Sequence, residues 1–321
     1  MSKREITFGG ARFGADTRIV DLVNVVPSDV GPLSELTELR ELRVLQTNPH
    51  ESVVALPIDL SPLMNLRHLE VLGLPELVVR DLTPLRGLSQ LREIDLTSTD
   101  VVDISPLQNC RSLRVLRLRG TKVQSIEPLS NLTHLAVLDV GYTLITDVAP
   151  LRDLDDLMEV AIDNTNVTDV AAMRNLERLT KLSINGTRIQ SLNSLRELKW
   201  FHSTERMDLS DTRIADLSDI ETAGQITELF LFNTPVSDIS PLTQLTRLRV
   251  LRLDNTAVTD LAPLRALTAL EELSLAGLAV TDLAPLSGLR TLRKLDVTGT
   301  SIQQQQVETL PRRKEIEILG P

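Results

Sequence analysis

The residues that most often carry catalysis or bind metals are few in this sequence: four histidines and one cysteine. The histidines are far apart and lack the spacing of metal ligands: His50, His68, His134 and His202. Cys110 stands in a sequence column that leucine fills elsewhere, so we expect a buried, unreactive thiol. A single cysteine also cannot form an intramolecular disulfide. These residues give no indication of an enzyme, and we predict a chain with no catalytic residues, metal or cofactor.

A glycine-rich segment at residues 9–14, with the sequence GGARFG, has a spacing that faintly resembles a phosphate-binding loop. Such a loop also needs a Lys-Ser/Thr pair at its end and a strand before it. The pair does not follow here, and no strand clearly precedes the segment. The segment is therefore disfavoured as a phosphate site.

Two phenylalanines have the spacing of a binding surface. Phe230 and Phe232 are two of seven aromatic residues (five Phe, one Tyr, one Trp), and they occupy alternate positions of a short segment. An exposed aromatic pair with charged neighbours is typical of a protein-binding hot spot. The alternative is that Arg252 stacks on Phe230 and that the pair only covers the scaffold. The charged neighbours are Asp208, Asp211, Arg252 and Asp254.

A second candidate group for partner binding consists of Arg117, Arg119 and Tyr142. Arg117 stands between Asp95 and Asp139 at the same position of neighbouring rows, so a cross-strand ion ladder is the alternative to a binding role. Arg119 has no acidic residue at its position in the rows on either side. We therefore predict that Arg119 is free to take a carboxylate of a partner.

A repeat that fills most of the chain must position these candidates. The pattern Asp-(Leu/Ile/Val)-x-Pro-Leu, with several variations, begins twelve rows, nearly all of them 22 residues long. The first row has 30 residues, with extra ones around 48–55, and the row from Ser191 has 25. The rows begin at Asp29, Asp59, Asp81, Asp103, Ser125, Asp147, Asp169, Ser191, Asp216, Asp238, Asp260 and Asp282.

Within each row the spacing of the apolar residues changes midway. Leu-x-x-Leu-x-Leu favours an arc that enters a short strand, and Pro-Leu-x-x-Leu favours a tight 3₁₀ or helical turn. Each row can bury its apolar side only against its neighbours, so the stacked rows predict an α/β repeat solenoid. We expect a curved solenoid with a concave parallel β-sheet of about fourteen strands and short 3₁₀ or helical convex segments.

This pattern resembles the short 22-residue class of leucine-rich repeats, as found in bacterial internalins and in eukaryotic phosphatase-regulating repeat proteins. The resemblance implies a leucine-rich-repeat horseshoe and recognition of another protein. One departure is threonine at the ladder position, where the family usually has asparagine. We expect its hydroxyl to bridge backbone groups of successive turns. The threonines are Thr47, Thr99, Thr121, Thr143, Thr165, Thr187, Thr212, Thr234, Thr256 and Thr300.

Two further columns predict how each row turns. Proline stands three residues after most row starts, where its fixed φ and missing N–H suit the first residue of a helix. The opening Asp or Ser can accept a hydrogen bond from an N–H of the same turn. Ten opening Asp residues equal the net charge of −10 in number, so we assign the acidity to the scaffold. The acidity disfavours a nucleic-acid partner.

The ends and the long row are expected to serve packing. Residues 1–28 are predicted to be an N-terminal cap with a half-repeat, residues 29–303 twelve leucine-rich repeats, and residues 304–321 a C-terminal capping helix and strand. Both caps together suggest a nearly complete protein. In the long row we expect a bulge before the strand, with Trp200 lying over it. A partner contact is the alternative for this insertion.

The leading function hypothesis is a non-enzymatic scaffold that binds a protein on its concave face around Phe230, Phe232 and Arg252. The alternative is a regulatory subunit or exported effector that controls an enzyme in trans. A stand-alone enzyme is disfavoured, because no nucleophile–base pair, metal cluster or phosphate loop is evident. No apolar run of signal-peptide length opens the sequence, and no membrane span is evident. We therefore expect a cytoplasmic monomer or an exported effector.

Overall fold

The computed structural model describes residues 5–24, 30–45, 57–311 and 313–320. Four sequence predictions lie outside the described residues: those on Asp29, Thr47, His50 and the extra residues of the first row. The chain divides into two compact units, each described by itself below. Unit 1 consists of Met1–Asn166 with Asn175–Leu182, and unit 2 of Val167–Arg174 with Ser183–Pro321.

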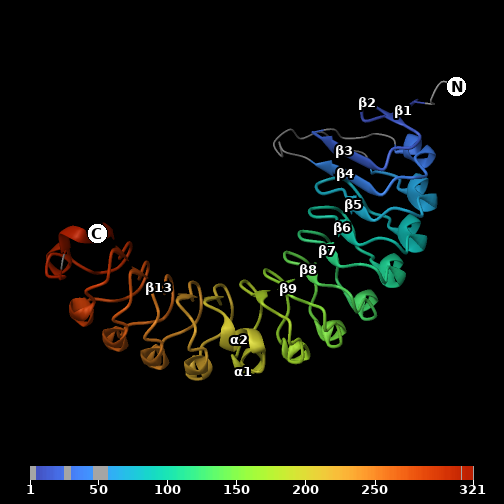
Figure 1. Ribbon diagram of the computed structural model, residues 1–321. Helices are drawn as coiled ribbons and strands as arrows, with labels where there is room; N and C mark the ends of the chain where they lie inside the picture. Colours follow the sequence, from blue (N-terminus) through green and yellow to red (C-terminus); the bar gives the residue numbers. More distant parts are fainter. Residues whose placement is uncertain (1–4, 25–29, 46–56, 312, 321) are drawn as a thin grey trace. The chain divides into compact units, whose positions relative to one another are not determined.

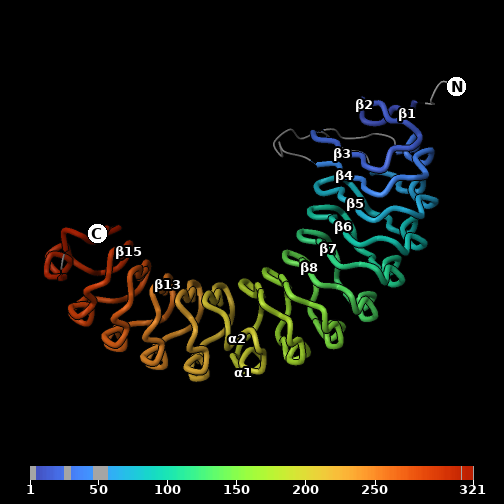
Figure 2. Tube along the Cα trace, in the orientation of Figure 1, coloured from blue at the N-terminus to red at the C-terminus, as the bar shows by residue number. Residues whose placement is uncertain are grey.

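Each unit is a coil of stacked rows, with short strands along one side and short helices along the other (Figures 1 and 2). We call these two sides the strand face and the helical face. In the two larger sheets successive strands pair in parallel, and most of the helical segments are 3₁₀ turns. The predicted repeat solenoid with a parallel sheet and 3₁₀ turns is therefore confirmed.

Unit 1 begins with an antiparallel hairpin, which is followed by the strands of an eight-stranded sheet. The hairpin strands are β1 (Glu5–Phe8) and β2 (Ala11–Gly14). The sheet contains β3 (Ile19–Val23), β4 (Glu41–Leu45), β5 (Val71–Gly73), β6 (Glu93–Asp95), β7 (Val115–Arg117), β8 (Val137–Asp139), β9 (Glu159–Ala161) and β10 (Lys181–Ser183). The 3₁₀ helices of unit 1 are η1 (Gly31–Glu35), η2 (Ser61–Asn65), η3 (Thr83–Gly87), η4 (Ser105–Asn109), η5 (Glu127–Leu129) and η6 (Ala149–Leu151).

Unit 2 contains a six-stranded parallel sheet. Its strands are β11 (Arg206–Asp208), β12 (Glu228–Phe230), β13 (Val250–Arg252), β14 (Glu272–Ser274), β15 (Lys294–Asp296) and β16 (Glu317–Leu319). Its helical segments are η7 (Ala171–Met173), α1 (Asn193–Arg196), α2 (Lys199–Ser203), η8 (Ser218–Thr222), η9 (Ser240–Gln244), η10 (Ala262–Ala266), η11 (Ala284–Gly288), α3 (Gln304–Val307) and η12 (Arg313–Glu315).

The apolar columns of the rows form the core of both units. In the row from Asp103, Leu107, Leu113, Leu116 and Leu118 are all fully buried, and the same columns are buried in the other described rows. The strand then ends, and a residue in the left-handed region of φ turns the chain toward the next helical segment in most rows. The apolar spacing therefore places alternate strand residues on the strand face and their neighbours in the core.

The glycine-rich segment is part of the opening hairpin and not of a phosphate-binding loop. Gly9 and Gly10 lie between β1 and β2 with φ of 57° and 80°, values that glycine adopts without strain. A strand, β2, follows directly, so the helix start that such a loop needs is not there.

The opening residue of each described row accepts a hydrogen bond from the backbone N–H two residues later, as the sequence predicts. Asp81 Oδ1 accepts from Thr83 N at 2.8 Å, and Ser125 Oγ accepts from Glu127 N at 3.2 Å. Proline in the first turn completes this start in most of the 3₁₀ helices. The hydrogen bonds hold the pKa of Asp59 and Asp81 below the ordinary value of 3.8, mainly through the side chains of Ser61 and Thr83.

Acidification is expected to destabilise the fold through these turns. For Asp59, Asp81 and Asp238, the pKa is lower in the folded chain than its ordinary value of 3.8. A carboxyl group whose pKa is lowered by folding stabilises the folded chain at every pH above its ordinary pKa of 3.8. This stabilisation is lost as the pH falls through the pKa of the folded state. The variant with all three changed to Asn should therefore lose less stability than the wild type between pH 5 and pH 3. Chemical denaturation at each pH measures this, and equal losses for the two proteins would contradict it.

Most described threonines of the ladder column are buried, but their hydroxyls do not join successive turns as the sequence predicts. Thr121 Oγ1 donates to Leu118 O at 2.7 Å, within its own row, and Thr143 Oγ1 donates to Val140 O in the same way. The short hydroxyl reaches the carbonyl three residues back in its own turn, whereas an asparagine amide has the reach for a neighbouring turn. The predicted bridging between rows is therefore wrong, and the threonine closes its own turn instead.

The long row from Ser191 contains helix α2 in place of the predicted bulge. Trp200 is only 3% exposed and Phe201 is fully buried, so both rings belong to the core of unit 2. His202 fixes the helix by contacts of its ring nitrogens with the carbonyl oxygens of Arg196 and Thr222. The extra residues therefore turn inward, and the idea that Trp200 lies over a bulge is wrong.

Candidate functional site

The predicted aromatic pair lies on the strand face of unit 2. In the parallel register, Phe230 of β12 lies between Asp208 of β11 and Arg252 of β13. We call this line of positions the first outward column. Phe230 is half-buried and Arg252 is exposed. No ion pair joins Arg252 to any described residue. The partner-binding role of these residues remains a prediction.

A second outward column runs beside the first, two residues further along each row. Here Phe232 lies between Ser210 and Asp254, because the backbone ladder continues past the strands: Asp211 N donates to Phe232 O, and Asn233 N to Asp254 O, both at 2.9 Å. Phe232 and Asp254 are half-buried, whereas Ser210 is fully buried. The two phenylalanines therefore occupy outward positions two residues apart on one face, as predicted.

Arg206, which the sequence analysis did not single out, covers one side of the aromatic pair. Its guanidinium carbon lies 4.4 Å from the centre of the Phe230 ring, and its Nη1 donates to Glu228 Oε2 at 2.8 Å. The predicted alternative, in which Arg252 stacks on Phe230, is therefore wrong. The sequence could have indicated this contact. Arg206 and Glu228 are paired in the register, and each stands two residues before a member of the first outward column, Asp208 or Phe230.

Two of the predicted acidic neighbours are held by the scaffold. Asp208 Oδ1 accepts from Ser210 N at 3.1 Å, which closes the turn after β11. Asp211 Oδ1 accepts from the Asn233 amide at 2.9 Å, and this amide oxygen in turn accepts from Asn255 at 3.0 Å. Both carboxylates therefore serve the fold at the edge of the aromatic pair.

A small hollow of about 20 Å³ lies on the same strand face, lined by Arg252 but by neither phenylalanine. It lies where Ser274, a small and buried residue, stands between Arg252 and Asp296 in the first outward column. Leu319 of β16 closes its far side and is 39% exposed. The strand face of unit 2 thus offers rings, a hollow and an apolar residue in one line.

Arg119 in unit 1 is not free, so the prediction that it can take a partner's carboxylate is wrong. Its guanidinium donates to both carboxylate oxygens of Asp163, at 3.0 and 2.6 Å, and lies 3.4 Å from Asp139. These partners raise the pKa of Arg119, chiefly through the hydrogen bond with Asp163, whose side chain is only 6% exposed. Arg119 therefore belongs to the scaffold.

Gly141 explains how Arg119 reaches a carboxylate two rows away. A Cβ at this position would lie 2.5 Å from Arg119 Nη1 and 2.8 Å from Asp163 Oδ1, so only glycine leaves room for the pair. Sequence reasoning considered only the rows beside Arg119 and therefore missed Asp163. The glycine between them was the signal that could have revealed it.

Tyr142 and Arg117 complete the second candidate group. Tyr142 is 56% exposed, and the Arg119 guanidinium lies 4.7 Å from its ring centre. Its φ of 54° is unusual for a bulky side chain, because that region favours glycine and asparagine. Arg117 pairs with Glu93 at 2.7 Å. The alternative that Arg117 forms a cross-strand ion pair is therefore correct, but the partner is Glu93 and not Asp95 or Asp139.

The residues that could carry catalysis are separated from one another. Burial raises the pKa of Cys110 to about 11, and its side chain is 1% exposed, which confirms a buried, unreactive thiol. His68, His134 and His202 are exposed in different rows. Among the described residues, no cluster of three or more His, Cys, Asp or Glu could hold a metal ion. No helix in the described part of the chain is long and apolar enough to span a membrane.

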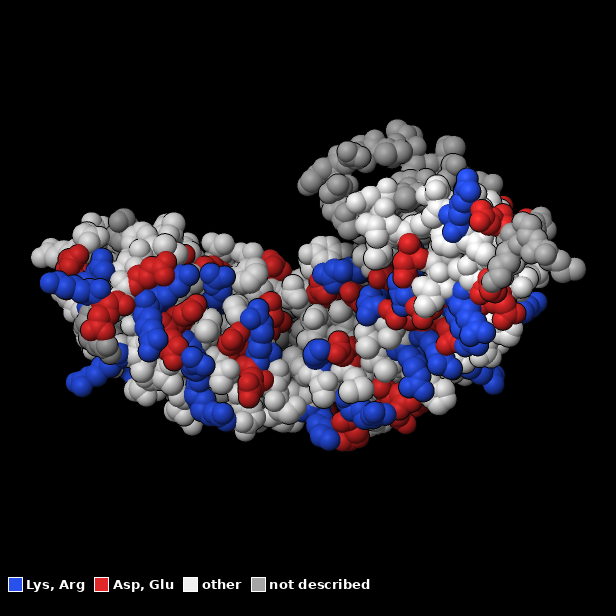
Figure 3. All heavy atoms as spheres, turned by 45° about the horizontal axis from the view of Figure 1, so that its top comes forward, with Lys and Arg blue, Asp and Glu red and all other residues white. Residues whose placement is uncertain are grey.

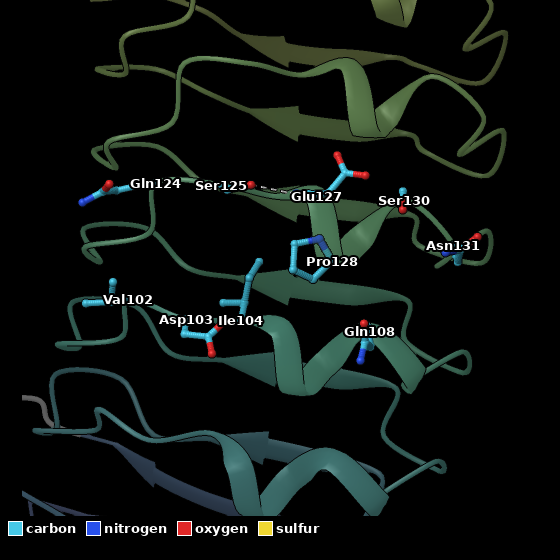
Figure 4. Close-up of a pocket in the computed structure, with 10 residues that line it drawn as sticks. All are labelled: Val102, Asp103, Ile104, Gln108, Gln124, Ser125, Glu127, Pro128, Ser130 and Asn131. Carbon is cyan, nitrogen blue, oxygen red and sulfur yellow. Dashed lines mark hydrogen bonds between the residues drawn. The ribbon is translucent and has the colours of Figure 1, made fainter.

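A surface groove of about 590 Å³ separates two rows of unit 1 (Figure 4). It lies between the rows that begin at Asp103 and Ser125, where serine replaces the usual aspartate. Ser125 Oγ accepts from Glu127 N, and Asp103 accepts from Ser105, so these polar groups are already used by their turns. Ser125 and Asp103 therefore serve the turns of their own rows.

Acidic and basic side chains alternate over the surface shown in Figure 3 and do not separate into patches of one sign. Many of them pair between neighbouring rows, such as Arg249 with Glu271 at 2.9 Å and Arg178 with Asp156 at 2.6 Å. Exposed pairs of this kind contribute little to stability, about 0–1 kcal/mol each. The charge pattern of the surface is therefore mostly a feature of the repeat.

Comparison with known proteins agrees with this architecture. The family model described as "Leucine Rich repeats (2 copies)" matches residues 111–153 and 225–266. The structure of an internalin, InlF, from Listeria monocytogenes is similar with a TM-score of 0.83 and 23% identity, covering 97% of this chain and 90% of that one. No curated protein matches the chain. The matched segments are leucine-rich repeats, and the chain shares the leucine-rich-repeat solenoid fold of the internalin structure.

Two further solved structures share the fold. A leucine-rich-repeat protein of Leptospira interrogans has a TM-score of 0.69 and 17% identity, covering 95% of this chain and 90% of that one. The ectodomain of the plant receptor kinase GASSHO1/SCHENGEN3 from Arabidopsis thaliana, solved in complex with CASPARIAN STRIP INTEGRITY FACTOR 2, has a TM-score of 0.66 and 18% identity. It covers 90% of this chain and 39% of that one.

Proposed function

We propose that the chain is a non-enzymatic protein-binding scaffold that grips a protein partner on the strand face of unit 2. The observation that carries the proposal is Phe232, a half-buried aromatic ring on an outward column. Neighbouring rows have Ser210, Asp254 and Ala276 at the same position, so the scaffold does not require a ring there.

The surroundings of Phe232 support a protein partner. A ring beside Phe230, with Arg252 and acidic residues at its edge, combines an apolar anchor with a charged rim, as binding hot spots do. Carboxylates outnumber cations in the first and second outward columns of unit 2. They would repel the phosphates of a nucleic acid, which disfavours a nucleic-acid partner. The structural likeness to a plant receptor ectodomain solved in complex with CASPARIAN STRIP INTEGRITY FACTOR 2 adds support, because such a fold can present a binding surface.

Affinity capture from the lysate of the source organism tests this proposal. We expect the wild type to retain a specific protein and the variant Phe230→Ala/Phe232→Ala/Arg252→Ala to lose it, because truncating the central residues of an interface typically costs about 2 kcal/mol or more per hot spot. Circular dichroism and thermal melting must first show that the variant is folded. All three side chains lie outside the core, so their substitution should leave it intact.

A matched control is Tyr142→Ala/Leu144→Ala, which removes two side chains of unit 1 that are 56% and 50% exposed. This control should keep the captured protein. If the control loses it and the unit 2 variant keeps it, the binding surface lies in unit 1 and the proposal is wrong. If the wild type captures nothing, the target lies outside that cell, which favours the exported-effector alternative.

A further inference from the structure

Two buried polar atoms on the strand face of unit 2 have no hydrogen-bond partner among the described residues: Ser210 Oγ and Asp254 Oδ2. The other oxygen of Asp254 accepts from Ser274 Oγ. Ser210 and Asp254 lie on either side of Phe232 in the second outward column. Because a buried polar atom without a partner is costly, two such atoms around one half-buried ring require an explanation.

Unit 1 has the same pair of positions with a different occupant. Arg119 and Asp163 are separated by 44 residues in the second outward column, and Ser210 and Asp254 have the same separation. In unit 1, the Arg119 guanidinium crosses Gly141 and satisfies both oxygens of the carboxylate. Asp254 in unit 2 therefore corresponds to Asp163 in unit 1, which pairs with an arginine. Ser210 stands at the position that corresponds to Arg119.

The chain also places arginine over its other outward rings. Arg206 lies over Phe230 and pairs with Glu228, and Arg119 lies over Tyr142 and pairs with a carboxylate. Phe232 differs from both, because no cation of the described chain lies over its ring. A ring and a carboxylate in this arrangement attract a guanidinium, which stacks by its flat face and donates at its edge.

We propose that the protein partner supplies this arginine, which lies over Phe232 and donates to the carboxylate of Asp254. This inference rests on the proposed function and defines its partner: a segment with an arginine beside apolar residues. Arginine fits better than lysine, because its planar fork can stack and pair at once. Because Oδ2 is buried in the free chain, binding requires a side-chain rearrangement at Asp254 or Phe232 that opens this oxygen to the partner.

The charges around Phe232 favour a cation at this place. Asp208, Asp211 and Asp254 lie in the two rows on either side of Phe232, whereas Glu272, one strand beyond β13, stands opposite Lys294 in the register. Arg252 is the opposing charge, whereas the charge of Arg206 is neutralised by its partner on β12. The balance on this part of the strand face is therefore negative, and it attracts a basic segment and repels an acidic one.

Random twelve-residue peptides displayed on phage and selected on the full chain provide the test. We expect selected peptides to carry arginine and to bind Asp254→Asn roughly tenfold to a hundredfold more weakly than the wild type, the equivalent of a hydrogen bond to a charged group. Fluorescence anisotropy at one fixed salt concentration measures this. Replacing the peptide's arginine with citrulline should cause the same loss on the wild type and little further loss on Asp254→Asn.

The matched control is Asp260→Asn, which removes one negative charge from the same unit at the start of η10, where Asp260 also closes a turn by accepting from Ala262 N. Its peptide affinity should stay within about twofold of the wild type, since its charge is not at the ring. Thermal melting verifies that each variant folds. Asparagine at 254 can still accept from Ser274.

The outcomes separate this inference from the proposed function. If Asp254→Asn binds as tightly as the wild type while Phe232→Ser does not bind, the strand face is the binding surface and the arginine inference is overturned. If neither substitution weakens the peptides, both ideas fail for these ligands. Selection of peptides without arginine, or equal binding of the citrulline peptides, also overturns the inference.

Discussion

Phe201→Ala is expected to lower the free energy of unfolding of unit 2 by about 3–5 kcal/mol, the range found when large aromatic residues are removed from a core. Phe201 is the largest of the fully buried side chains, and its ring meets His202 edge-on with centroids 5.6 Å apart. Alanine would leave a cavity under helix α2, which the surrounding leucines cannot fill without moving. Urea denaturation followed by circular dichroism measures the change.

Phe230→Ala is the control for this prediction, because it makes the same chemical change at a half-buried ring on the strand face. It should cost clearly less than Phe201→Ala, since part of the ring is already in contact with water. Comparable losses for the two variants would show that Phe230 is part of the core, which would also weaken the binding proposal.

Arg119→Ala is expected to destabilise unit 1 by about 2–3 kcal/mol, because it leaves the buried carboxylate of Asp163 without its guanidinium partner. This loss of stability is smaller than for a wholly buried ion pair, because the Arg119 side chain is 35% exposed and water screens its charge. The Asn164 amide still donates to Asp163 at 3.2 Å, but it carries no charge. The double variant Arg119→Ala/Asp163→Ala should recover part of the loss.

Arg117→Ala is the matched control, since the two arginines lie two residues apart. Arg117 pairs with Glu93 at 2.7 Å, and both side chains are more than a third exposed, at 38% and 35%. The substitution should cost less than about 1 kcal/mol. If it costs as much as Arg119→Ala, the buried pair is not what stabilises this part of the sheet.

The fold could be predicted from the sequence because one short pattern recurs with a nearly constant period. The opening Asp, the proline and the leucine columns each have a local physical role, and repetition made the register evident. The helix at Lys199–Ser203 could not be predicted in this way, because an insertion breaks the period. Nothing in the pattern indicates whether Trp200 turns outward or into the core, where the structure has it.

The candidate site could be predicted only where its contacts lie between adjacent rows. Reading neighbours in one column paired Phe230 with Asp208 and Arg252 correctly, but it missed Arg206, which approaches from the preceding alternate position. It also missed Asp163, which Arg119 reaches two rows away. Long arginine side chains cross columns and rows, so a column-by-column reading underestimates their partners.

The central claim is that a protein partner binds the strand face of unit 2, and site-specific photo-crosslinking tests it most directly. A photoreactive phenylalanine analogue at Phe232 is compared with the same analogue at Gln244, an exposed residue of η9 on the helical face of the same unit. We predict that a specific covalent adduct forms in lysate of the source organism with the analogue at Phe232 and not at Gln244. An adduct at Gln244 with none at Phe232 would contradict the account.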